Sequence, residues 1–396
     1  MSRFALAFPC LLLLLLLLTS SACSGPGQVA SDAPSLIPAF NTGRFLWVDD
    51  SGIRLRDLAL DKNQELGEGG DLHFASVSPN GSHAVLAIGT GSESRLLLLS
   101  TKSGPLTRLH SGSETLIYTG SWSPNGSQFA FGYYEPTTAN DRPALGSGDI
   151  KIISLTDNAV RRLGCSSSKA VISWPSSAEL VVRSTDHLYR VTSTDCGTLQ
   201  TTDIHRWTLI TPSPNGQHLA YTFRELAFNS TTREYEPDSA LFVASVNDGE
   251  PVKIVGDRYR PRHANWSADG TEIAFDVRVD PDSEIRTISI YSLATEEATF
   301  AFPPSVHGSS KTHPVWNSDG QSLSFREDGS RLLIQTPGAS FSQTVTLGDA
   351  QSFATRLVGW LSPVTVLVSD DQDSVWMYHV PSEAIEFVGI GTGIPF

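Results

Sequence analysis

Trp122-Ser-Pro-Asn-Gly126, followed closely by Phe129-Ala-Phe131, is one copy of a phrase that recurs along the chain. Its first part predicts a tight turn, because proline presets φ, asparagine tolerates the next position and glycine adopts the left-handed conformation that closes the turn. Its second part predicts a strand with large residues on one face and a small one on the other. The other good copies are Val77-Ser-Pro-Asn-Gly81, Pro212-Ser-Pro-Asn-Gly216 with Leu219-Ala-Tyr221, Trp266-Ser-Ala-Asp-Gly270 with Ile273-Ala-Phe275, and Trp316-Asn-Ser-Asp-Gly320 with Leu323-Ser-Phe325.

Each copy begins a unit of about 40 to 50 residues, and a period of this size indicates an array of supersecondary units. Further apolar runs make four strands per unit, so we predict an all-β fold, a β-propeller of four-stranded antiparallel blades. Counting degenerate copies gives eight blades; seven is the alternative, because Phe40-Asn-Thr-Gly43 is the weakest copy. Eight complete units imply a ring closed by blade-to-blade packing, without a shared strand, in one domain over residues 38–396. The residues ahead of the turns are Phe40, Val77, Trp122, Trp174, Pro212, Trp266, Trp316 and Trp360.

The repeated turn and the apolar–small–aromatic strand that follows it resemble the WD-type repeat of the TolB-like propellers, over about residues 38 to 394. The resemblance implies the fold. It implies a function only as a class, because one fold hosts unrelated activities. The same repeat occurs in periplasmic scaffold proteins, in the propeller domains of prolyl-oligopeptidase-like peptidases and in some polysaccharide lyases.

The N-terminal segment is typical of an export signal, with Arg3 ahead of an unbroken apolar run, Leu11–Leu18, and small residues before Cys23. Small residues directly before a cysteine resemble the bacterial lipoprotein signal, in which that cysteine is lipidated. Ser20 departs from that pattern, and ordinary signal cleavage is the alternative. We expect an exported protein, held by an acyl anchor on the periplasmic or extracellular side of a membrane. The predicted segments are a signal peptide over 1–22 and a lipidated, flexible tether over 23–37.

Two cysteines, Cys165 and Cys196, remain once Cys10 has left with the signal peptide and Cys23 is lipidated. Two thiols in an oxidising compartment are expected to form a disulfide. The alternative is a pair of free thiols.

The acidic charge of the chain limits the kinds of partner that it can bind. The chain has 42 acidic and 28 basic residues, a net charge of −14, and no lysine or arginine cluster. This disfavours binding to nucleic acid or directly to an anionic membrane surface. The expected partner is an envelope protein or an extracellular ligand, with the membrane contacted through the acyl chain only.

Three histidines, His73, His263 and His313, lie three or four positions before their turn anchors, where the innermost strand of each blade is expected. Further basic residues lie beside them or near the same place in another blade. Inner strands line the central channel of a propeller, so their side chains are candidates to bind an anionic ligand or to form part of a metal site. The alternative is that each histidine hydrogen-bonds the neighbouring blade. The candidates are His73, His205, Arg206, Arg262, His263, Lys311 and His313.

The connections between second and third strands are long in three units: Tyr134–Gly148, Arg224–Ser239 and Arg278–Arg286. Such connections share one face of a propeller, and long loops on one face are common docking surfaces. The alternative is that these long connections have no function. The candidate contacts in the second loop are Phe228, Arg233 and Tyr235.

Two acidic runs, Asp280–Glu284 and Asp370–Asp373, have oxygen ligands that suit calcium. Neither has the spacing of a known calcium loop, so we interpret both as solvated turns. The sequence predicts neither a metal nor a cofactor.

The common catalytic signatures are missing: there is no Gly-x-Ser-x-Gly elbow, no His-Glu-x-x-His, no phosphate loop and no Gly-x-Gly-x-x-Gly after a strand. A lyase whose active-site residues come from several blades would carry none of these short motifs. The sequence therefore favours a non-enzymatic binding or scaffold protein of the cell envelope. The alternative is a propeller lyase or hydrolase that acts on an anionic polysaccharide through its channel residues.

Overall fold

The structure, a computed structural model, falls into two units, residues 1–36 and residues 37–396, and every residue that it describes lies in the second. It describes residues 44 to 395 except 50, 58–59, 61, 91–92, 101–105, 113–115, 140–141, 158, 164–169, 177–178, 184–187, 193–195, 199–208, 230–233, 248–250, 303–307, 339–341, 348–351, 355, 371, 373 and 391.

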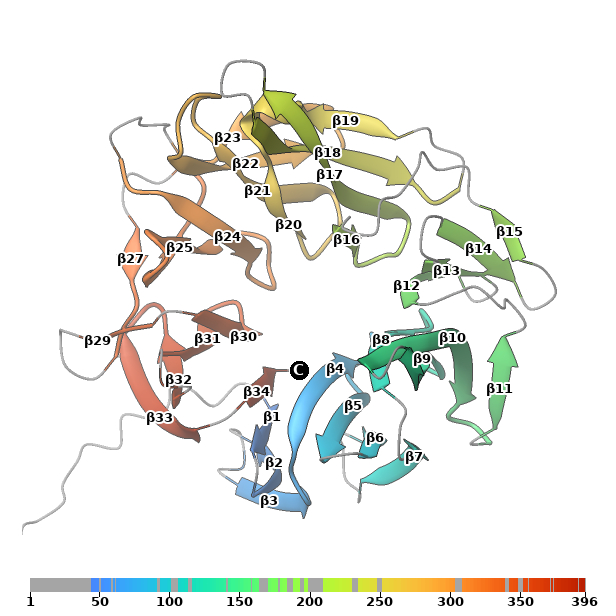
Figure 1. Ribbon diagram of the computed structural model, residues 1–396. Coiled ribbons are helices and arrows are strands. Elements are labelled where there is room, and N and C mark those ends of the chain that lie inside the picture. The colour runs from blue at the N-terminus through green and yellow to red at the C-terminus, as the bar shows by residue number, and fades with distance from the viewer. Residues whose placement is uncertain are drawn as a thin grey trace, which may run out of the picture. The chain divides into compact units, whose positions relative to one another are not determined.

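Eight four-stranded antiparallel sheets follow one another as the blades of a propeller (Figure 1). This confirms the predicted fold class and the count of eight blades, which we number in chain order. Among the described residues the one helix is a short 3-10 turn, η1 (Asp257–Tyr259), and none is long and apolar enough to cross a membrane.

The strands of each blade run from the innermost to the outermost. Blades 2 to 4 contain β4 (Asp71–Val77), β5 (His83–Thr90), β6 (Glu93–Ser100) and β7 (Thr107–Gly112); β8 (Leu116–Trp122), β9 (Gln128–Ala139), β10 (Arg142–Ser154) and β11 (Val160–Leu163); β12 (Ala170–Ser176), β13 (Glu179–Arg183), β14 (Leu188–Thr192) and β15 (Cys196–Thr198). Blades 5 and 6 contain β16 (Leu209–Pro212), β17 (His218–Asn229), β18 (Glu234–Ser245) and β19 (Val252–Val255); β20 (Arg262–Trp266), β21 (Glu272–Arg278), β22 (Arg286–Ser292) and β23 (Glu297–Phe300). Blades 7 and 8 contain β24 (Lys311–Trp316), β25 (Leu323–Glu327), β26 (Arg331–Gln335) and β27 (Gln343–Thr344); β30 (Arg356–Ser362), β31 (Thr365–Ser369), β32 (Ser374–His379) and β33 (Ala384–Ile390), with the hairpin β28 (Thr346–Leu347) and β29 (Ser352–Phe353) between them.

Blade 1 closes the ring, and it does so differently from the prediction. Its strands are β34 (Thr392–Pro395), β1 (Arg44–Asp49), β2 (Gly52–Asp57) and β3 (Lys62–Gly67), so the last strand of the chain pairs antiparallel with the first (Figure 1). The expected closure without a shared strand is therefore wrong. Hydrogen bonds between β34 and β1 join the two ends of the propeller, where packing alone was expected.

The recurrent turns have the predicted geometry. In the copy between β8 and β9, the Gly126 N–H donates to the Ser123 carbonyl at 2.8 Å, and Gly126 has φ 68°. The Asn125 side-chain oxygen accepts a hydrogen bond from the Ser127 N–H at 3.0 Å, and this contact stabilises the turn. Each of these contacts is local, which explains why the phrase alone predicts the turn.

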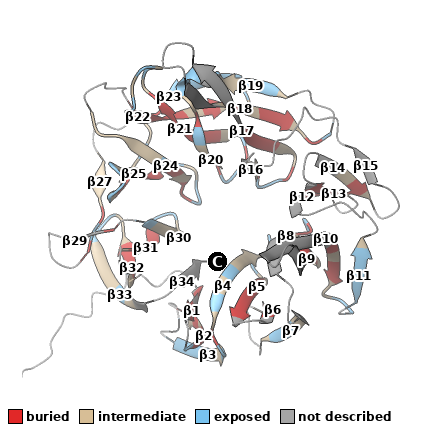
Figure 2. Ribbon diagram, viewed as in Figure 1, coloured by how far each residue is buried: buried red, intermediate tan, exposed pale blue. Residues whose placement is uncertain are grey.

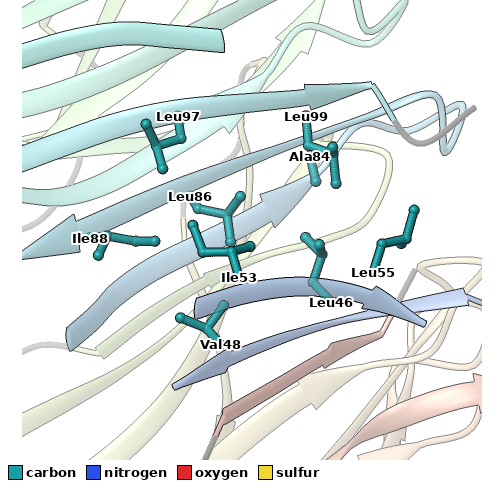
Figure 3. Packing of buried hydrophobic residues seen from close by; sticks show 9 residues of the cluster. All are labelled: Leu46, Val48, Ile53, Leu55, Ala84, Leu86, Ile88, Leu97 and Leu99. Atoms are coloured by element: carbon teal, nitrogen blue, oxygen red, sulfur yellow. The ribbon is translucent and has the colours of Figure 1, made fainter. Parts of the chain in front are cut away.

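The anchor tryptophans lie between blades, as their size suggested. Trp122 is 5% exposed, and its indole N–H donates to the Ser76 carbonyl of blade 2 at 3.2 Å. Between blades 1 and 2, aliphatic side chains of β1 and β2 face those of β5 and β6 (Figure 3). Exposure is concentrated on outermost strands such as β3, β11 and β23 (Figure 2). The core is therefore a ring of apolar layers between neighbouring sheets.

Two of the three expected loops are β-ribbons. Strands β9 and β10 have 12 and 13 residues, β17 and β18 have 12 each, and the cross-strand register continues through Arg224↔Ser239 to Phe228↔Tyr235. The loop prediction is wrong here. Proline is tolerated because a two-stranded ribbon leaves one edge of each strand without a ladder partner, as at Pro237, which lies opposite Leu226.

Several predicted features lie outside the described residues: the signal peptide, Cys23 and the tether, Phe40, Cys165 and Arg233. Cys196 begins β15, and its side chain is not described. The disulfide between Cys165 and Cys196 stays a prediction.

Candidate functional site

Two candidate histidines lie in β-bulges of the innermost strands of neighbouring blades. The register of β20 against β21 shifts between Arg262 and Asn265, and that of β24 against β25 shifts between Thr312 and Val315. His263 and His313, inside these bulges, have φ 49° and 56°. This left-handed conformation costs a residue other than glycine about 1–2 kcal/mol. Such strain persists where surrounding contacts hold it, and bulges often re-aim side chains beside functional sites.

A buried carboxylate joins the two blades. Asp276 on β21 is fully buried, and its Oδ2 atom lies 2.5 Å from His263 Nδ1 and accepts the His313 backbone N–H at 3.3 Å. Its other oxygen accepts a hydrogen bond from Arg286 Nε. The Arg286 guanidinium also donates to the Arg260 carbonyl at 2.5 Å and to the Asp276 carbonyl at 3.1 Å. We call His263, Asp276, Arg286 and His313 the polar cluster.

The imidazole rings of His263 and His313 are stacked, with centroids 3.6 Å apart and an interplanar angle of 23°. Burial of the ring, followed by the positive charges of His263 and Arg326, lowers the pKa of His313 to about 4, although Asp276 opposes the shift. His313 is therefore neutral at neutral pH. A neutral ring accepts the stacked contact with His263 without repulsion between two cations.

Asp276 stays ionised although it is buried. Burial is the largest effect on its pKa and raises it, but the hydrogen bond from His263 and the charges of Arg286 and His263 together outweigh burial and hold the pKa of Asp276 below its ordinary value. The carboxylate consequently holds His263 by its Nδ1 atom. A histidine fixed at one nitrogen offers the other, Nε2, to a ligand or a proton. The His263 side chain is 34% exposed, so solvent reaches it.

The polar cluster lies at the same end of the blades as the two ribbons. Arg262, the first residue of β20, pairs with Asp276, and Arg278 at the end of β21 pairs with Arg286 at the start of β22. The starts of inner strands and the hairpins between second and third strands therefore share one face. The two long ribbons and the two strained histidines therefore lie on the same face.

The other predicted channel residues are not all brought together. His73 also lies at a bulge, between Leu72 and Phe74, but its ring covers Gly89, where an added Cβ would lie 2.3 Å from Nε2. No hydrogen bond, ion pair or ring contact joins it to His263 or His313. Lys311 Nζ lies 3.9 Å from Glu327, and Arg262 is exposed. His205 and Arg206 lie outside the described residues.

The acidic runs form turns. The Asp280 carboxylate accepts the Asp282 N–H at 2.9 Å, and Glu284 pairs with Arg278. The Asp370 carboxylate accepts two backbone N–H groups, from Gln372 and Ser374, both at 2.9 Å. In the part of the chain that the structure describes, no group of three or more His, Cys, Asp or Glu side chains is placed to hold a metal ion.

Sequence reasoning missed Asp276, Arg286 and Arg326. A signal for two of them is present, because Asp276 directly follows the triplet Ile273-Ala-Phe275 and Arg326 follows Leu323-Ser-Phe325. A charged residue at the same place in consecutive repeats indicates an equivalent position on the second strands of neighbouring blades. Arg286 carries no such signal, because its role depends on the partner strand.

No protein-family model matches the sequence, and a search of curated proteins finds no match. Solved structures do match. The dihydro-heme d1 dehydrogenase NirN, solved in complex with DHE, has a TM-score of 0.58 at 14% identity, over 90% of this chain and 75% of NirN. The oligogalacturonate lyase from Vibrio parahaemolyticus has a TM-score of 0.53 at 14% identity, over 87% of this chain and 98% of the lyase.

TolB from Acinetobacter baumannii is also similar, at 15% identity and a TM-score of 0.40, over 78% of this chain and 64% of TolB. The first two matches support a β-propeller architecture, and identities this low show the fold alone. The predicted membership of the TolB-like family stays a prediction. One fold hosts unrelated activities, so these matches do not decide the function of this protein.

Proposed function

We propose that this protein is a non-enzymatic binding propeller of the cell envelope, which docks its partner on the face that carries the polar cluster and the two ribbons. One observation carries the proposal: two histidines in left-handed backbone conformation are held by a buried aspartate at the end of the blades where the ribbons extend. Strained, tethered side chains beside extended hairpins form a preorganised docking surface.

Photocrosslinking at the two ends of one blade tests the choice of face. Asp282 lies in the turn between β21 and β22, and Ala268 lies in the turn between β20 and β21, at the opposite end; both are exposed. A photoreactive residue at Asp282 is expected to give a discrete adduct in intact cells, detected on denaturing gels, while the same residue at Ala268 gives none. Adducts from Ala268 alone, or equally from both sites, contradict the proposal. Removal of residues 227–236 at the ribbon tip should abolish the Asp282 adduct and leave the melting temperature nearly unchanged, because β16 and β19 do not pair with this part of β17 and β18.

A lipid anchor is part of the same proposal. Cys23→Ala is expected to release the protein from membranes and to abolish labelling by a palmitate analogue, because the acyl chain supplies the membrane affinity. Cys10→Ala, inside the leader, is the matched control and should change neither. If immunoblotting still finds the Cys23 variant in the membrane fraction, the lipid anchor is contradicted.

An enzyme is the second candidate, and the contact between His263 and Asp276 favours it. A carboxylate that fixes one nitrogen of an imidazole is an arrangement that general bases use. A lyase or hydrolase acting on an anionic polysaccharide would need substrate at His263 Nε2. Replacing His263 would then abolish turnover, whereas a docking surface loses one contact among many.

A further inference from the structure

A cavity of about 210 Å³ lies between blades 8 and 1. It adjoins the strand pair β34–β1, which joins the two ends of the propeller (Figure 1). Its walls include Phe45 of blade 1 and Met377 and Val388 of blade 8. Phe45 is 0% exposed and Met377 is 1% exposed, so core side chains form part of the wall. We call this space the seam cavity.

The polar side chains that line the seam cavity already contact other side chains of the protein. Arg56 donates to Asn63 Oδ1 at 3.5 Å, and its guanidinium lies 3.7 Å from Glu386 of blade 8. Arg54 donates to Ser51 Oγ at 2.6 Å. Burial of apolar surface is favourable without any specific partner. We therefore expect the apolar walls to decide which group the cavity takes.

The strand register gives the reason why this interface differs from others. In blades 3 and 6, the anchors Trp122 and Trp266 pair with the second residue of the following strand. Phe45 is the second residue of β1, and its partner is Pro395 of β34. Strand β34 therefore takes the inner-strand place that the repeat assigns to the segment ending at Phe40. The phenyl ring of Phe40 gains stability from another apolar site, because its exposure to water is unfavourable.

Phe40 is close enough along the chain to reach the seam cavity. It lies four residues before Arg44, the first residue of β1, and four extended residues span at most about 14 Å. Phe45 pairs with Arg56, and both line the cavity, so β1 begins beside it. Phe40 also ends an apolar run, Leu36-Ile-Pro-Ala-Phe40, directly ahead of the propeller.

We propose that the phenyl ring of Phe40 inserts into the seam cavity, between Phe45 of blade 1 and Met377 and Val388 of blade 8. The volume is sufficient, because an engineered apolar cavity of about 150 Å³ binds benzene. A ring of the same chain is favoured over a side chain of a partner, because a short connection keeps its effective concentration at about the millimolar level. The insertion adds a second contact between the two ends of the propeller. It does not depend on the partner that the protein binds.

Photocrosslinking from position 40 in the purified full-length protein tests the insertion. A phenylalanine analogue with a photoreactive diazirine group at position 40 is expected to form an adduct with β32 or β33 of the same chain, located by tandem mass spectrometry. The same analogue at Phe300 of blade 6, which is 46% exposed, is the matched control and should give no adduct with blade 8. Adducts of position 40 with other blades or with water alone overturn the proposal. A covalent dimer also overturns it, because the segment would then insert into a second copy of the chain.

Thermal unfolding gives a second measurement. Phe40→Ala is expected to lower the melting temperature by about 3 °C or more, because it removes a ring from apolar contacts. Leu60 of blade 1 is 59% exposed, so Leu60→Ala is the control and should shift the melting temperature by less than about 1 °C. Phe40→Ala combined with Val388→Ala should lower it by less than the sum of the two single shifts, since both side chains belong to one contact. An unchanged melting temperature in Phe40→Ala, or strictly additive shifts, overturns the proposal.

Discussion

Trp266→Ala is expected to lower the free energy of unfolding by about 3–5 kcal/mol, the usual cost of replacing a buried tryptophan with alanine. The side chain is 5% exposed and packs between Ala220 and Leu241 of blade 5 and Phe275 of its own blade. Its indole N–H also donates to the Thr211 carbonyl of blade 5 at 2.9 Å. The substitution therefore opens a cavity and removes a hydrogen bond between two blades.

Denaturant unfolding followed by circular dichroism measures this loss, and Trp316 supplies the comparison. Trp316 is 6% exposed, and its indole N–H has no hydrogen-bond partner. Trp266→Phe should therefore cost about 1 kcal/mol more than Trp316→Phe, the net contribution of one hydrogen bond. Equal losses for the two phenylalanine variants would show that the contact with Thr211 adds no stability. A loss below about 1 kcal/mol for Trp266→Ala would contradict the prediction that these tryptophans stabilise the packing between blades, because opening a cavity of this size costs more.

Local signals predicted the parts of the fold that depend on local contacts. The hydrogen bond from Gly126 to Ser123 and the contacts of Asn125 span a few residues, so the phrase itself encodes the turn. The large residue ahead of it fills the space between sheets in every blade whose anchor is a described tryptophan. Counting these repeated features gave eight blades, with seven as the alternative because the first copy is weak.

The ring closure could not be predicted in this way. Strand β34 has four residues, Thr392–Pro395, and lacks the turn phrase and the triplet. Its pairing with β1 joins opposite ends of the chain, and no local pattern records such a contact. The ribbons β9–β10 and β17–β18 were missed for a different reason: proline and glycine usually indicate loops, but a two-stranded ribbon tolerates them on its free edges.

The candidate site was predicted in part. His263 and His313 both lie three residues before their anchors, and this spacing placed them among the candidate residues of the innermost strands. Asp276 was missed because an acidic residue on an antiparallel strand normally faces water. Its burial depends on Arg286 from the next strand and His313 from the next blade, and these partners are visible only in the folded chain.

Asp276→Asn is expected to destabilise the protein by about 3–5 kcal/mol, because it leaves the buried Arg286 guanidinium without its counter-charge. Asparagine keeps the size of the side chain and one oxygen that accepts from His263, but its NH2 group then faces the Arg286 guanidinium. The loss therefore combines the missing charge with the hydrogen bond to Arg286. Thermal and denaturant unfolding at neutral pH measure it. Asp276→Asn combined with Arg286→Met should lose less than the sum of the two single variants, since removing both charges removes the unpaired one. Strict additivity would mean that the two side chains do not interact energetically.

The same carboxylate predicts how stability changes with pH. The pKa of Asp276 is held below its ordinary value in the folded protein, chiefly because the hydrogen bond from His263 and the charge of Arg286 outweigh burial. The contribution of the ionised Asp276 to the free energy of unfolding is therefore fully present above the unfolded pKa of about 4. It is lost as the pH falls through the lower pKa of the folded protein. Denaturant unfolding at a series of pH values should show the wild type losing its advantage over Asp276→Asn in that acidic range. A difference in the free energy of unfolding that stays constant from neutral pH to well below pH 4 would contradict this prediction. It would mean that the charge of Asp276 does not stabilise the contact between blades 6 and 7.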